Sequence, residues 1–93
     1  MVRITADLSL YPLLSSYIPK IEAFVREIQE TPGLEVVVNQ LSTQIRGEVS
    51  EVTRAVEAAL VMSFRGGESQ VLVVKYLNAD LPIGEAPVLG PPG

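Results

Sequence analysis

Hydrophobic and polar residues alternate along residues 2–11. One side of this segment carries Val2, Ile4, Ala6, Leu8 and Leu10, and the other carries Arg3, Thr5, Asp7, Ser9 and Tyr11. A period of two is typical of a strand that buries one face. Pro12 has no amide hydrogen to contribute to a sheet, so we expect the strand to end there.

Two later segments have the spacing of amphipathic helices. Apolar residues recur every three or four positions in residues 16–30, at Ile18, Ile21, Val25 and Ile28. The same spacing returns in residues 49–64, at Val52, Val56, Ala59 and Leu60. Each pattern predicts a helix with one apolar face. Ser16 and Ser50 are candidate caps for the two helix starts.

Three more strands are expected. Residues 34–40 and 41–47 are rich in β-branched and alternating residues, and we place a tight turn between them near Asn39-Gln40. Residues 70–78 form the last strand. It is apolar on both faces, a pattern typical of a strand that is covered on both sides. We expect Val74 of this strand to lie in a contact between copies of the chain.

The element order is therefore β-α-β-β-α-β. This order predicts an α+β ferredoxin-like sandwich, in which a four-stranded antiparallel sheet carries both helices on one face. We assign residues 1–80 to this domain and residues 81–93 to a tail that holds four of the seven prolines and three of the seven glycines. The second face of such a sheet is left bare.

Composition suggests how the bare face is covered. The chain has 93 residues, 47% of them hydrophobic, and a mean hydropathy of +0.32. A domain of this size buries a smaller share of its surface than a larger one, so apolar residues are left over. We expect the partner to be a second copy of the chain, in a homodimer or homotetramer formed through the sheet.

Charge and residue content exclude several functions. The formal net charge is −4, which disfavours nucleic acid as a partner. The sequence contains no His and no Cys, so the usual general bases and metal ligands are missing, and we expect neither an enzyme nor a metal site or cofactor. The sequence has no apolar run long enough to span a membrane and no signal-peptide pattern, so we expect a cytoplasmic protein without a membrane partner.

The polar side of the first strand allows two interpretations. Thr5, Asp7, Ser9 and Tyr11 could simply face solvent. They could also form the floor of a pocket for a small, flat, partly cationic heterocycle, because ligand pockets combine apolar walls with a few polar groups.

Two short runs carry a family resemblance. Ser9-Leu10-Tyr11-Pro12-Leu13 ends the first strand, and Ser42-Thr43-Gln44-Ile45-Arg46-Gly47-Glu48 leads into the second helix. On the expected elements, these runs resemble the thiamine-binding YkoF-like family of small βαββαβ proteins, over about residues 3–78. The resemblance implies an oligomeric cytoplasmic protein that binds thiamine or its hydroxymethylpyrimidine moiety without changing it, at an oligomer interface on the open sheet face.

The ligand residues that the resemblance and the hydroxyl and aromatic side chains suggest are Ser9, Tyr11, Thr43, Gly47, Glu48 and Tyr76. Structural roles are the alternatives: Tyr11 as a subunit contact, Thr43 as a core-side β-former, Gly47 as part of a turn and Glu48 as a helix-start charge. Arg46 departs from the family pattern, in which an acidic or small residue often precedes the glycine. Its guanidinium would repel a thiazolium cation if it faced the pocket.

Two other functions stay open. The protein could be a structural or regulatory oligomer in which the sheets pack together without a small molecule. An enzyme is the third alternative, and it is disfavoured because the chain offers no base with a pKa near neutrality.

Overall fold

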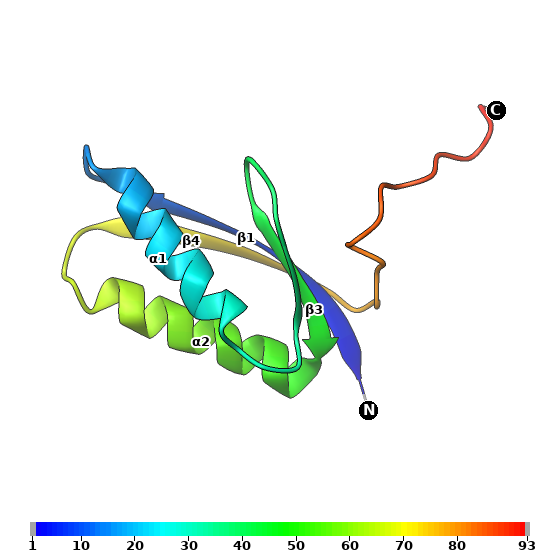
Figure 1. The fold of residues 1–93 in the computed structure, drawn as a ribbon, viewed down its shortest axis with the longest axis horizontal. Helices are drawn as coiled ribbons and strands as arrows, with labels where there is room; N and C mark the ends of the chain where they lie inside the picture. The colour runs from blue at the N-terminus through cyan, green and yellow to red at the C-terminus, as the bar shows by residue number, and fades with distance from the viewer. Residues whose placement is uncertain (1, 93) are drawn as a thin grey trace.

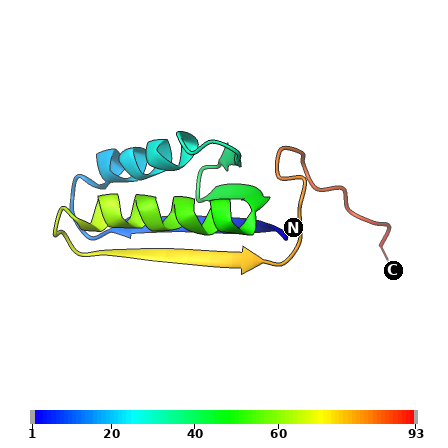
Figure 2. The ribbon, with the colours of Figure 1, turned by 90° about the horizontal axis from the view of Figure 1, so that it is seen from below.

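The computed structural model describes residues 2–92 and has the predicted βαββαβ order (Figure 1). The elements are β1 (Arg3–Pro12), α1 (Tyr17–Gln29), β2 (Glu35–Val38), β3 (Thr43–Glu48), α2 (Val49–Phe64) and β4 (Gln70–Leu77). Both helices lie on one side of the sheet, and the tail leaves the domain at the end of β4 (Figure 2). The predicted ferredoxin-like α+β class is confirmed.

The four strands are arranged in the order β2-β3-β1-β4, and all neighbours are antiparallel. Strand β1 therefore pairs on both of its edges, with β3 from Arg3 to Leu8 and with β4 from Thr5 to Pro12. Its strict alternation follows from this position, because a central strand has one face against the helices and the other on the open side. Pro12 still pairs with Gln70 at the end of the ladder.

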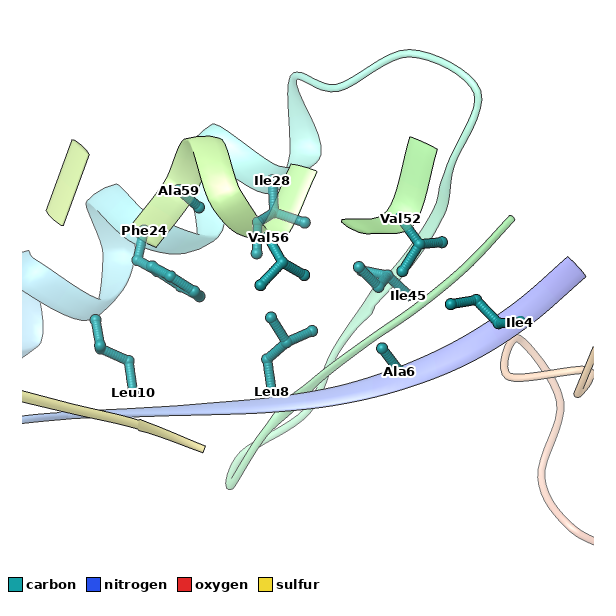
Figure 3. Close-up of a cluster of buried hydrophobic side chains, with 10 residues drawn as sticks. All are labelled: Ile4, Ala6, Leu8, Leu10, Phe24, Ile28, Ile45, Val52, Val56 and Ala59. Carbon is teal, nitrogen blue, oxygen red and sulfur yellow. The ribbon is translucent and has the colours of Figure 1, made fainter. Parts of the chain in front are cut away.

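The core lies between β1 and the two helices. Figure 3 shows the side chains of one face of β1 directed at those of α1 and α2. Its buried members are Ile4, Ala6, Leu8, Leu10, Phe24, Ile28, Ile45, Val52, Val56 and Ala59. On α2 the cluster contains three of the predicted apolar positions, Val52, Val56 and Ala59. On α1 it contains Ile28 together with Phe24, whereas Ile18, which was predicted to be on the apolar face, is 56% exposed.

The capping of the two helices differs from the prediction, whereas the hairpin turn does not. Ser16 is the N-cap of α1, but its side chain makes no capping hydrogen bond. Helix α2 follows β3 without a loop, so Glu48 is its N-cap and Ser50 lies inside the helix. The tight turn predicted near Asn39-Gln40 is present one residue further on, because the Asn39 amide donates to the Ser42 carbonyl at 2.8 Å and only Gln40 and Leu41 lie between them.

The two faces of β4 have different surroundings. Leu72 and Val74 are partly buried and pack against the core from the helix side. Val71 and Val73 lie on the open side and are 48% and 41% exposed. Placing Val74 in a contact between copies was therefore wrong, since the helices already cover its face. The open side of this strand belongs to Val71 and Val73.

Lys20 of α1 connects the two helices with the turn before β4. Lys20 Nζ lies 3.0 Å from Glu68 Oε2 and donates to the Ser63 carbonyl at 3.3 Å. The hydrogen bond from Lys20 is the main reason why the pKa of the Glu68 carboxyl is lowered. The Ser63 hydroxyl also donates to the Gln70 side chain at 2.7 Å, which fixes α2 to the first residue of β4.

Replacing Phe24 by alanine should strongly reduce stability. The side chain is only 2% exposed, so the change leaves a cavity and should cost about 3–5 kcal/mol. Urea unfolding followed by circular dichroism measures the cost. Phe64→Ala is the matched control because Phe64 is 40% exposed, and a control loss as large as that of Phe24→Ala would contradict the placement of the core.

Candidate functional site

The six predicted ligand residues do not converge on one place. Side chains at positions directly opposite in neighbouring strands share a face of the sheet. Thr43 is opposite Leu8, Gly47 is opposite Ile4 and Tyr76 is opposite Ala6, which puts all three on the helix side. The remaining three, Ser9, Tyr11 and Glu48, lie on the open side. The predicted single site on the open face is therefore divided between two faces.

Gly47 and Glu48 have structural surroundings. A Cβ atom on Gly47 would lie 2.8 Å from Leu34 Cδ2 and 3.3 Å from the Gly33 carbonyl oxygen. The glycine is thus needed where the α1–β2 connection approaches β3. Glu48 is the N-cap of α2, where a carboxylate is favoured by the helix dipole. Glu48 fits the helix-start alternative given above. Gly47 lies inside β3 and is explained by this close approach, not by the turn suggested for it.

The two tyrosines cannot hold one ring between them. Tyr11 is 53% exposed on the open face. Tyr76 is half-exposed on the helix side, and partial burial raises the pKa of its phenol. Stacking of one pyrimidine between them is excluded by the sheet that separates their side chains.

Ser9 and Thr43 meet at a small cavity between α1 and the β2–β3 turn. The cavity has a volume of about 100 Å³. Its apolar walls include Leu10, Ile21, Phe24 and Val38, and Asn39, Gln40 and Ser42 add polar groups at the turn. Ser9 Oγ donates to the Leu41 carbonyl at 3.3 Å, so the end of β1 also holds the turn in place. The combination of apolar walls and a few polar groups is that of a ligand pocket.

The tail begins by crossing one end of the open face. Thr5 Oγ1 donates to the Ala79 carbonyl at 2.7 Å and accepts from the Leu81 amide at 3.0 Å. Thr5 is consequently only 6% exposed, although the sequence placed it among solvent-facing residues. The first residues after β4 are therefore fixed to the sheet.

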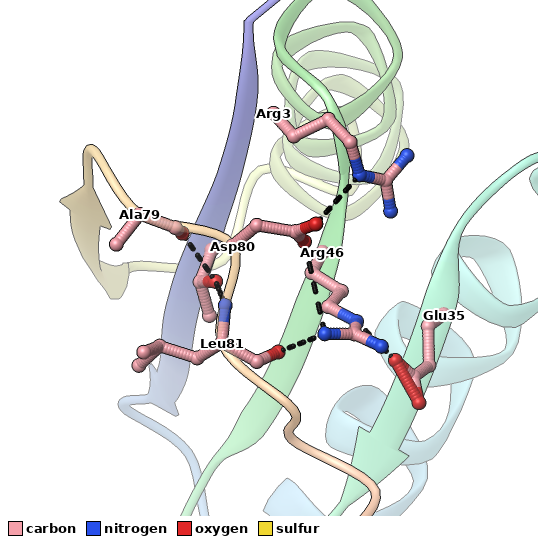
Figure 4. Close-up of polar contacts among 7 residues, drawn as sticks. Arg3, Glu35, Arg46, Ala79, Asp80 and Leu81 are labelled. Atoms are coloured by element: carbon pink, nitrogen blue, oxygen red, sulfur yellow. Dashed lines mark hydrogen bonds and ion pairs between the residues drawn. The ribbon is translucent and has the colours of Figure 1, made fainter.

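Charged residues hold the same crossing in place (Figure 4). Asp80 accepts a hydrogen bond from Arg3 at 2.9 Å, which raises the pKa of the Arg3 guanidinium, and lies 3.7 Å from Arg46. Arg46 also pairs with Glu35 and donates to the Leu81 carbonyl at 2.6 Å. The charge of Arg46 is thus matched by two carboxylates. Sequence analysis gave no role to Asp80, because its contacts depend on strand register.

A larger hollow lies where the tail continues beyond this crossing. It has a volume of about 880 Å³ between residues 81–88 and the β2–β3 half of the open face, at Val37, Asn39 and Gln44. None of the six predicted ligand residues lines it. Residues 81–88 thus form one wall of a hollow beside the β2–β3 half, and the tail then leads away from the domain (Figure 1).

No metal site or membrane helix is found in the part of the chain that the structure describes. Within residues 2–92, no three His, Cys, Asp or Glu side chains are grouped so that they could hold a metal ion. None of the helices in that range is long and apolar enough to cross a membrane.

Comparison with known proteins decides the family. The profile of the YKOF-related Family matches residues 3–81. The chain belongs to the YkoF-related family. The match covers the whole sheet, both helices and the start of the tail at Leu81, so the crossing described above falls inside the region that this family shares.

Several solved structures share the fold of this YkoF-related chain. Protein MJ1052 of Methanocaldococcus jannascii is 20% identical, with a TM-score of 0.75 over 86% of this chain and 84% of that one. Protein SP2199 of Streptococcus pneumoniae is 21% identical, with a TM-score of 0.77 over 85% and 89%. Protein TM0486 of Thermotoga maritima, provisionally assigned to thiamine biosynthesis or salvage, is 17% identical, with a TM-score of 0.70 over 92% and 90%.

These identities establish the fold alone. No protein with curated function matches the chain. The function of this member of the YkoF-related family therefore has to be argued from its own residues.

Replacing Thr5 by valine should free the start of the tail. The change keeps the shape of the side chain but removes both hydrogen bonds to residues 79 and 81, so we expect a loss of about 1–3 kcal/mol in stability. Hydrogen–deuterium exchange should also show faster exchange of the Leu81 amide. Thr53→Val is the control, because the Thr53 hydroxyl bonds only within its own helix. An unchanged exchange rate at Leu81 would contradict the crossing.

Proposed function

We propose that this protein binds thiamine or its hydroxymethylpyrimidine moiety without transforming it, and that it works as a homo-oligomer paired through the open face of its sheet. Membership of the YkoF-related family supports a small-ligand role. The thiamine assignment of the Thermotoga maritima neighbour supports the choice of ligand. Binding without chemistry fits a sequence that has no His or Cys and hence few groups for proton transfer or nucleophilic attack.

The cavity between α1 and the β2–β3 turn is the observation that carries the ligand proposal. It brings Ser9 and Thr43 together against apolar walls, as a pyrimidine ring with amino and nitrogen groups requires. Its volume of about 100 Å³ is below the ~300–1,000 Å³ of typical ligand sites. We therefore expect residues 39–42 to move outward when the ring enters, with the remainder of the ligand near the turn.

The open face supports the oligomer. Tyr11, Val71, Val73 and Leu77 lie on it and are each between 41% and 53% exposed. Apolar side chains grouped in this way on a small domain mark an interaction surface. The same observation also favours the alternative of a structural or regulatory oligomer without a ligand. Only a measurement of thiamine or hydroxymethylpyrimidine binding separates this alternative from the ligand-binding oligomer.

Thiamine and hydroxymethylpyrimidine should raise the melting temperature of the protein as their concentration rises, because a ligand of the native state stabilises it by mass action. Thr43→Val should weaken the binding roughly tenfold through the loss of one hydrogen bond. Isothermal titration calorimetry measures the change. Thr53→Val, on the exposed side of α2, should leave the affinity unchanged.

A melting temperature that does not respond to millimolar concentrations of either compound would rule out the ligand and favour the ligand-free oligomer. Tyr11→Ala tests the location, since Tyr11 is on the opposite face from the cavity. If Tyr11→Ala abolished binding and Thr43→Val did not, the site would lie on the open face.

Val73→Glu should dissociate the oligomer into monomers. The change puts a carboxylate without a partner into an apolar contact, which costs several kcal/mol. Size-exclusion chromatography with light scattering gives the mass. Val61→Glu is the matched control, because Val61 is a similarly exposed valine on α2 (40%). A wild-type protein that is monomeric at high concentration would overturn the proposed oligomer.

A further inference from the structure

The large hollow between the tail and the sheet combines apolar walls with one charge. Its volume of about 880 Å³ is within the ~300–1,000 Å³ of typical ligand sites. The walls include Val37 on the sheet and Ile83, Pro87 and Val88 on the tail. Among the described residues that line it, Glu85 is the one that carries a charge. Apolar walls with a single carboxylate suit an organic cation.

Glu85 is positioned by the fold of the tail. Its amide donates to the Pro82 carbonyl at 3.1 Å and so closes a tight turn. Leu81, just before this turn, is fixed to the sheet: its amide donates to the Thr5 hydroxyl at 3.0 Å and its carbonyl accepts from Arg46 at 2.6 Å. The carboxylate of Glu85 is therefore carried by a turn that follows directly on an anchored residue.

The charge of Glu85 is available to a ligand. The side chain is exposed and takes part in none of the ion pairs formed within residues 2–92. Arg46, the base on the neighbouring part of β3, is already held by Glu35 and Asp80 and does not line the hollow. Two carboxylates thus offset the one positive charge that was expected to repel a thiazolium.

The sheet side of the hollow adds two primary amides. Val37 and Gln44 are register partners in β2 and β3, and Asn39 follows β2 at the turn. All three line the hollow. Asn39 also lines the small cavity between α1 and the β2–β3 turn. The two spaces therefore adjoin at Asn39, with the end of β2 between them.

We propose that this hollow holds the thiazolium half of thiamine while the pyrimidine half enters the small cavity, and that Glu85 distinguishes thiamine from hydroxymethylpyrimidine. The inference rests on the proposed function and assigns a place to the second half of the ligand. One methylene group joins the two rings of thiamine, so neighbouring rings occupy adjoining spaces. With the pyrimidine beside Thr43, the thiazolium lies past Asn39.

The selectivity follows from charge. A thiazolium carries a permanent positive charge, whereas hydroxymethylpyrimidine is neutral near pH 7 and gains nothing from a carboxylate. An ion pair that is fully exposed to water contributes little, but apolar walls such as Val37 and Ile83 lower the local dielectric and strengthen it. We expect Glu85 to improve the affinity for thiamine about fivefold.

The tail makes this subsite a property of this chain. The family match ends at residue 81, whereas Glu85 and the tail wall of the hollow come after it. Binding of the pyrimidine thus depends on the domain that the family shares. Selection for the cation depends on a segment outside the match.

Glu85→Gln tests the subsite because it keeps the size of the side chain and removes its charge. We expect a loss of about fivefold in thiamine affinity and no change in hydroxymethylpyrimidine affinity, both measured by isothermal titration calorimetry. Added salt should weaken thiamine binding more in the wild type than in the variant, because salt screens an exposed pair. Glu57→Gln, on the exposed side of α2, is the matched control. It alters the net charge equally and should change neither affinity.

Two results would overturn the subsite and leave the proposed function standing. One is an unchanged thiamine affinity in Glu85→Gln. The other is an equal loss for both compounds, which would mean that Glu85 acts only through the shape of the tail. In either case, binding that still depends on Thr43 keeps the small cavity as the site. If the wild type binds neither compound, the proposed function fails and this subsite fails with it.

Discussion

The position of β1 between β3 and β4 is the constraint on which the rest of this structure depends. Because both edges of β1 are paired, its alternating side chains determine what lies on each side of the sheet. Ile4, Ala6, Leu8 and Leu10 build the core with the helices. The residues between them lie in the middle of the open face. There Thr5 holds the start of the tail through its hydrogen bond to Ala79, and Asp7 has a buried carboxylate oxygen without a hydrogen-bond partner.

Most of the fold could be predicted because its determinants are local. The period of β1, the apolar faces of α1 and α2 and the order of elements were all visible in the sequence. The cap of α2 was not, since Ser50 is a good capping residue by type but β3 runs directly into the helix at Glu48. The choice of face for β4 was also hidden, because apolar residues occupy both of its faces and alternation therefore does not tell the buried face from the open one.

The site was harder to predict because it depends on register. Thr43, Gly47 and Tyr76 were candidates by residue type. Which face of the sheet a side chain lies on depends on the register between strands, which the sequence does not show. The register puts these three on the helix side and Ser9 and Tyr11 on the open side. The contacts of Asp80 with Arg3 and Arg46 join residues far apart in sequence, and nothing local indicates them. Two short motifs nevertheless sufficed to suggest the family: the first ends β1, and the second spans β3.

The crossing of the tail also brings the two ends of the domain together. Arg3 at the start of β1 is hydrogen-bonded to Asp80, just beyond β4. Neighbouring chain ends are the condition under which a domain accepts circular permutation or duplication within one polypeptide. A few added residues could join position 80 to position 3 of the same or of a following domain, and the new ends could open at the exposed turn of residues 39–42. The order of the strands in space would then survive a complete change in their order along the gene.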